Sequence, residues 1–295
     1  MRRWVATAAA AAGEVAARPA LWMPAALAWI ASVGWIPFLA AVMRPPSVAE
    51  LTFFGARLVT SGAWPWNAAL IACAATALIL LAFALAAVGN AVLIAQLAGR
   101  PASGADAARL LGVSLLAALP AAVAATLLGI ALASVAPAEF NAPETGGGPV
   151  LRTIAGVAPQ LVLLGIVALV GAACAALAGR LSMRDGSSPV GGLTATPAIL
   201  ARIGGAAVAH AIAAALIGAG FLVVAALLLG VLWAPIGAWL GGGGEIDVAI
   251  GLLLVGFVAI WLCLVIVGGA LHAWSASTWS RLLGSGARPM HPRRT

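Results

Sequence analysis

The side chains best suited to acid–base or metal chemistry are three histidines, His210, His272 and His291, and they lie far apart in the sequence. No HExxH or GxSxG segment occurs, so the common zinc-protease and serine-hydrolase motifs are missing. The chain also has no lysine, which excludes a GxxxxGK[ST] phosphate-binding loop and a Schiff-base lysine. The sequence therefore predicts no catalytic site, no metal site and no cofactor, and we expect that the protein is not an enzyme.

Carboxylates are absent from all of the long apolar runs. Proton relays and aspartyl chemistry inside a membrane both need an Asp or Glu within a span. This pattern argues against a proton-coupled transporter of the usual kind, although a histidine can take the place of a carboxylate.

A few polar residues do fall within the apolar runs, and they gather toward one end of the predicted spans. They are Asn90, Gln96, Ser114, His210 and His272. One interpretation is a vestibule open to the cytoplasm in which His210 titrates. The simpler interpretation, which we favour, is hydrogen bonding between neighbouring helices.

Three small residues, Gly171, Ala175 and Gly179, follow each other at intervals of four in the fourth apolar run. Such a seam allows two helix backbones to approach closely and pack by dispersion. We expect the seam to pack within the chain, and a helix of a partner protein is the alternative.

The composition explains why these residues must be positioned by membrane helices. Of the 295 residues, 64% are hydrophobic and 8% are charged, whereas a soluble domain carries roughly 25% charged residues. The apolar residues form runs long enough to span a bilayer. The lipid bilayer is therefore the first expected partner, and the net charge of +7 reflects arginines beside the runs, not nucleic-acid binding.

The runs predict an all-α, polytopic membrane helix bundle of about six transmembrane helices. Residues 1–18 are expected to form an interfacial segment, not a cleaved signal, and residues 275–295 a polar tail. The transmembrane domain then covers residues 19–274, with spans at 19–43, 66–97, 110–135, 153–179, 203–233 and 248–274.

Arginine positions predict the orientation of the bundle. Twelve of the 15 arginines lie in the N-terminal segment, the second and fourth links and the C-terminal tail. Arginine-rich loops stay in the cytoplasm, so both termini are expected there. Nine of the 11 tryptophans fall near predicted span ends, which supports the same topology.

The links between spans hold two weaker features. The stretch 51–59 is partly apolar and is expected to lie along the membrane surface, with docking of a partner as the alternative. Glu245 and Asp247 follow a glycine run and are expected in a solvated loop, with cation binding as the alternative. The three cysteines fall inside apolar runs and are expected to be buried thiols.

Three short segments carry a resemblance: ARPALW at 17–22, SGADAARLLG at 103–112 and AWSASTWSRL at 273–282. Together they resemble bacterial six-span membrane proteins of unknown function, similar to the membrane domain associated with some glycerophosphodiester phosphodiesterases. The resemblance implies the six-span topology and a bacterial cytoplasmic (inner) membrane. It implies no phosphodiesterase activity, because no catalytic domain of that kind is present.

These observations favour a scaffold, assembly factor or accessory subunit of a membrane complex. The alternative is a permease subunit, because an amphipathic N-terminal segment before six spans also resembles the permeases of ABC-2-type exporters. That alternative implies a separate cytoplasmic ATPase as partner, docked on the second or fourth link.

Overall fold

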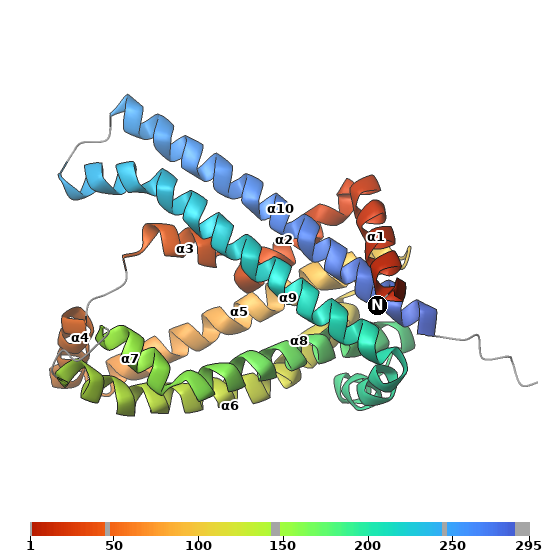
Figure 1. Ribbon diagram of the computed structural model, residues 1–295, viewed down its shortest axis with the longest axis horizontal. Helices are drawn as coiled ribbons and strands as arrows, with labels where there is room; N and C mark the ends of the chain where they lie inside the picture. The colour runs from red at the N-terminus through yellow and green to blue at the C-terminus, as the bar shows by residue number, and fades with distance from the viewer. Residues whose placement is uncertain (1, 45–47, 143–147, 244–246, 287–295) are drawn as a thin grey trace, which may run out of the picture. The chain divides into compact units, whose positions relative to one another are not determined.

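The computed structural model of the chain describes residues 2–44, 48–142, 148–243 and 247–286, and every regular element in these ranges is helical. In chain order the elements are α1 (Arg2–Ala17), η1 (Pro19–Leu21), α2 (Trp22–Trp29), η2 (Ile30–Gly34), α3 (Ile36–Val42), α4 (Val48–Thr60), α5 (Trp66–Leu97), α6 (Gly104–Asn141), α7 (Pro149–Gly156), α8 (Ala158–Asp185), α9 (Pro189–Gly241) and α10 (Val248–Gly286) (Figure 1). The predicted all-α fold class is confirmed.

The helices α5, α6, α8, α9 and α10 are each long and apolar enough to cross a membrane. The bent pair formed by Pro19–Gly34 and Ile36–Val42 supplies a sixth candidate span. In an apolar medium a helix satisfies its own backbone hydrogen bonds, which is why such runs adopt this structure. The prediction of about six membrane helices is therefore confirmed.

The first candidate span is not one straight helix. It bends by 48° where the π-helical turn η2 separates α2 from α3, and π-turns are a common cause of sharp helix bends. Ser32 within η2 donates its hydroxyl to the carbonyl of Ala28 at 2.9 Å. A side chain at Gly34 would collide with the indole of Trp29, so this turn needs a glycine there.

Several helix boundaries differ from the prediction. Helix α6 extends beyond the predicted span 110–135 at both ends, and the predicted fourth span at 153–179 is divided between α7 and α8. The fourth link, expected at 180–197, is shorter: α8 runs to Asp185 and α9 begins at Pro189. Gly204 has a non-helical backbone (φ 13°, ψ −97°) and divides α9 into segments 189–203 and 205–241. The Ser and Gly residues of the stretch 180–197 predicted a loop, but some of them lie on the first turns of α9. Helix α10 is also longer than predicted, because it continues past residue 274 to Gly286.

The chain divides into two compact units. The first contains residues 1–9, 103–215 and 278–295, and the second contains residues 10–102 and 216–277. The long helices α9 and α10 contribute to both units.

In the first unit, α6 and α8 lie side by side along much of their length (Figure 1). The seam of small residues on α8 faces α6. A Cβ atom on Gly171 would come within 2.8 Å of the carbonyl oxygen of Ala117, and one on Gly179 would collide with Leu110. Ala175, between them, is half-buried. The seam therefore packs two helices of the same chain.

In the second unit, α2 is packed closely against both α5 and α10. A Cβ on Gly89 of α5 would lie 2.7 Å from the carbonyl oxygen of Pro24, and one on Gly269 of α10 would lie 2.7 Å from the Cα of Ala26. Aromatic rings fill the neighbouring space, with the rings of Trp29 and Phe221 centred 5.7 Å apart. Small residues on α5 and α10 thus let α2 pack with both helices.

The outward faces of the candidate spans are apolar, as expected for contact with lipid. Two of the three cysteines lie on such faces: Cys73 on α5 and Cys263 on α10 are exposed, whereas Cys174 on α8 is half-buried. The expectation that all three are buried is wrong, because an apolar run in a membrane protein has lipid-facing as well as core-facing sides. In the fourth helix, α4, the exposed side chains include Phe53 and Phe54.

Candidate functional site

Two of the predicted polar residues are bonded to each other in the second unit. The Nε2 atom of His272 on α10 lies 2.9 Å from Oδ1 of Asn90 on α5. The amide nitrogen of Asn90 already donates to the carbonyl oxygen of Ala86 at 2.9 Å. Oδ1 is therefore the acceptor, and Nε2 of His272 carries the proton it donates. The pair joins two helices in the way the simpler sequence interpretation expects.

A second set of polar contacts ties the N-terminal helix to the same two helices. Ser277 of α10 donates its hydroxyl to Oε2 of Glu14 at 2.7 Å. Arg18 donates one N–H to Oε1 of Glu14 and another to the backbone carbonyl oxygen of Gln96, each at 3.1 Å. We call Glu14, Arg18 and Ser277 the N-terminal tether. It compensates the charge of a carboxylate that is only 20% exposed.

The tether was not predicted from the sequence, because Glu14 precedes the spans and the predicted polar residues all lie within them. The signal that was available is the spacing of four residues between Glu14 and Arg18, which brings opposite charges together at the end of α1. Ser277 has no such signal, because its role depends on how α10 is rotated.

Gln96 contacts the N-terminal tether through its backbone carbonyl oxygen and not through its side chain. Oε1 of Gln96 is buried, and no hydrogen bond to it is found within the described residues. The Asn90–His272 pair thus joins α5 to α10, and the backbone of Gln96 joins α5 to Arg18 just after α1.

The remaining predicted residues, His210 and Ser114, belong to the first unit. His210 on α9 is fully buried, and its ring meets the indole of Trp279 edge-on, with centroids 4.9 Å apart. Trp279 lies in an apolar cluster with Leu177, Ile203, Ala207 and Leu282. Ser114 is half-buried near the start of α6. The predicted vestibule around His210 stays a prediction.

Arg180 is a buried cation, whereas the sequence pattern indicated only a charge in a cytoplasmic link. Arg180 lies near the end of α8 and is 9% exposed. The Nε group donates to Oγ of Ser280 at 3.0 Å, and Nη1 donates to the carbonyl oxygen of Ala176 at 2.7 Å. Because a guanidinium keeps its proton at any ordinary pH, Arg180 serves here as a fixed donor that joins α8 to α10. Nothing in the sequence pattern distinguishes it from the other arginines beside the spans.

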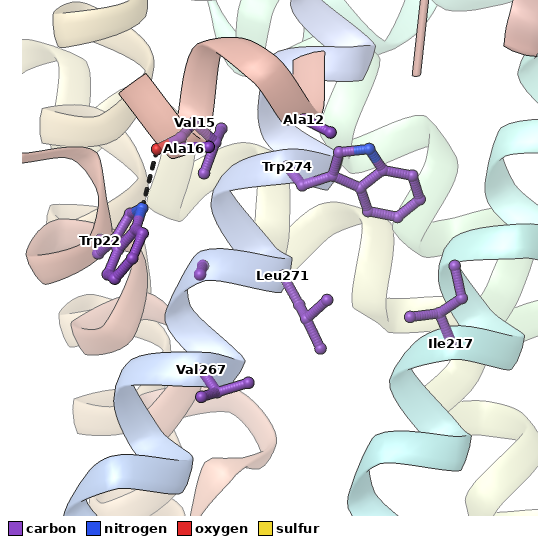
Figure 2. A pocket seen from close by; sticks show the side chains of 9 residues that line it. Ala12, Val15, Ala16, Trp22, Ile217, Val267, Leu271 and Trp274 are labelled. Atoms are coloured by element: carbon purple, nitrogen blue, oxygen red, sulfur yellow. Dashed lines mark hydrogen bonds between the residues drawn. The ribbon is translucent and has the colours of Figure 1, made fainter. Parts of the chain in front are cut away.

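An apolar pocket of about 400 Å³ lies in the second unit (Figure 2). Its wall comes from α1, α2, α9 and α10 and consists of Ala12, Val15, Ala16, Trp22, Ile217, Val267, Ala270, Leu271 and Trp274. The indole N–H of Trp22 is not available to a ligand, because it donates to the carbonyl oxygen of Val15 at 3.0 Å (Figure 2). No motif predicted this pocket, because its wall is made of ordinary apolar residues.

Elsewhere the described residues offer little for metal chemistry: in the ranges given above, no group of three His, Cys, Asp or Glu side chains is close enough to hold an ion. Asp247 accepts the backbone N–H of Ile250 at 2.8 Å and so caps the start of α10. Glu245, the other half of the cation hypothesis, lies outside the described residues.

Comparisons with protein-family models, with curated proteins and with solved structures found no match for this chain. The resemblance to six-span bacterial membrane proteins, and to ABC-2-type permeases, therefore remains a prediction.

Proposed function

We propose that the protein is a non-enzymatic subunit of a membrane complex, acting as a scaffold, assembly factor or accessory subunit. The proposal rests on one observation: polar side chains near the spans form hydrogen bonds from one helix to another. Asn90 bonds His272, Glu14 bonds Ser277, and Arg180 bonds Ser280, each pair joining two different helices. Polar side chains that bond one helix to another support a role in helix packing more than a role in catalysis or transport.

The proposed location is the bacterial cytoplasmic membrane, with both termini in the cytoplasm. The support is the bias of arginine toward the two termini and the even-numbered links. With this orientation the N-terminal tether and the end of α10 lie on the cytoplasmic side, and α4 lies on the opposite side.

The test is affinity purification of the tagged chain from its native membrane in a mild detergent, with the recovered proteins identified and quantified by mass spectrometry. We expect one membrane protein in constant ratio to the chain, and we expect the amount of that protein to fall when the chain is deleted. An unrelated six-span protein with the same tag is the control. Recovery of the chain alone would count against the proposal.

A permease working with a separate ATPase is the second candidate, and one observation favours it. The helical segment 189–203 of α9 directly follows the shortened fourth link and ends at the break at Gly204. A short helix beside a cytoplasmic link is a suitable contact for a docked ATPase.

This candidate predicts a cytoplasmic ATPase in constant ratio to the chain in the same purification. Ala198→Arg, at an exposed position of segment 189–203, should release the ATPase. Ala56→Arg, at an exposed position of α4, is the matched control and should retain it. Equal retention by both variants would contradict docking on this segment.

A further inference from the structure

The pocket in the second unit is a groove along one face of α10. Val267, Ala270, Leu271 and Trp274 are spaced as residues on a single helix face. At 1.5 Å per residue this face is about 10 Å long. Val267 and Ile217 on the wall are 48% and 44% exposed, so the groove is open at the surface of the apolar helices.

The wall determines what kind of molecule can bind. A volume of about 400 Å³ lies within the range of roughly 300–1,000 Å³ typical of ligand sites. All of the lining side chains are apolar or aromatic, and the N–H of Trp22 is already donated within the chain. The wall therefore offers few hydrogen bonds to replace those that a polar ligand loses with water, and it favours a hydrocarbon.

One end of the groove is suited to a charged group. Trp22 and Trp274 lie on the wall together with Ala16 of α1 (Figure 2), and tryptophan side chains favour the level of the lipid headgroups. Arg18 is not part of the wall, but it lies between Ala16 and Trp22 in the sequence, close to this end of the groove. Its side chain is 46% exposed, and it bonds Glu14 and the backbone of Gln96 on α5. A guanidinium has five N–H donors, so contacts to Glu14 and Gln96 leave donors for a phosphate.

We propose that this groove binds a phospholipid with an anionic headgroup, with an acyl chain along the α10 face and the phosphate near Arg18. The bound chain fills the space between α1 and the helices α9 and α10. This inference goes beyond the proposed function and does not depend on it.

The experiment compares the full chain with two variants of α10 in a mild detergent. Ala270→Phe puts a ring into the groove, whereas Ala259→Phe makes the same change at an exposed position of the same helix outside the groove. The probe is phosphatidylglycerol, added in increasing amounts and counted per protein molecule by native mass spectrometry. Phosphatidylcholine with the same acyl chains tests the headgroup.

We expect the unchanged chain and Ala259→Phe to retain one phosphatidylglycerol, and Ala270→Phe to bind it at least about tenfold more weakly. Loss of contact with two methylene groups is already worth about that factor. Should Ala270→Phe fail to fold, Ala16→Phe fills the groove from α1 and is expected to have the same effect.

Equal lipid retention by Ala259→Phe and the folded groove-filling variant would overturn the proposal. Equal affinity for phosphatidylglycerol and phosphatidylcholine would overturn the anionic headgroup. A dimer that the groove-filling variant converts to monomer would also overturn it, since a second copy of the chain would then occupy the groove.

Discussion

Replacing Gly269 by alanine should destabilise the second unit, because α10 has no room for a side chain there. A Cβ at this position would lie 2.7 Å from three atoms of Ala26, including its N and Cα. Ordinary contacts to a Cβ begin near 3.4 Å, so α2 and α10 would have to separate by about 0.7 Å, which is the difference between these two distances. Backbone atoms of a packed helix cannot move aside as the end of a flexible side chain can.

The matched control is Gly256→Ala on the same helix, where an added Cβ meets no atom within 4 Å. Because alanine has a higher helix propensity than glycine, each substitution alone would raise the free energy of unfolding by up to about 1 kcal/mol. That contribution cancels when the two variants are compared. The remaining difference is the cost of overpacking, typically about 1–3 kcal/mol. We therefore expect Gly269→Ala to be less stable than Gly256→Ala by about that amount.

The assay is reversible unfolding of the purified chain in mixed detergent micelles, followed by tryptophan fluorescence. Trp29 lies at this helix contact and should report its loss. A difference below about 0.5 kcal/mol between the two variants would refute the reasoning, because surface substitutions without any steric conflict differ by that much.

The other predictions concern the polar contacts and the topology. A double-mutant cycle with Asn90→Ala and His272→Ala should give a coupling free energy of about 0.6 kcal/mol in the same unfolding assay, and a value near zero would contradict the bond. Arg180→Ala should destabilise the first unit by about 1–3 kcal/mol, because Ser280 loses a buried partner. Arg184→Ala removes only an exposed ion pair and should cost less than about 1 kcal/mol. A fluorescent-protein fusion to the C-terminus should fluoresce in the cytoplasm, and a fused periplasmic phosphatase should stay inactive; the reverse pattern would contradict the proposed orientation.

The sequence by itself determined the helical spans, because long apolar runs in a membrane can satisfy their backbone only as helices. It also holds the local signal for the start of α6 at Gly104, although the predicted span began only at residue 110. There Ser103 accepts the backbone N–H of Asp106 at 3.2 Å, and the carboxylate of Asp106 accepts the backbone N–H of Ser103 at 3.0 Å. Such contacts involve residues three apart and need no tertiary information.

The tertiary structure decided which polar groups meet. Asn90 was predicted to bond a neighbouring helix, but its partner His272 is 182 residues away, and only the rotation of α5 and α10 brings the two together. The same holds for Ser277 and Glu14, separated by 263 residues. The apolar spacing of a membrane helix indicates that it spans the bilayer but does not indicate which side faces lipid, since both sides are apolar. For that reason the groove on α10, the exposed cysteines Cys73 and Cys263 and the buried Arg180 could be found only in the folded chain.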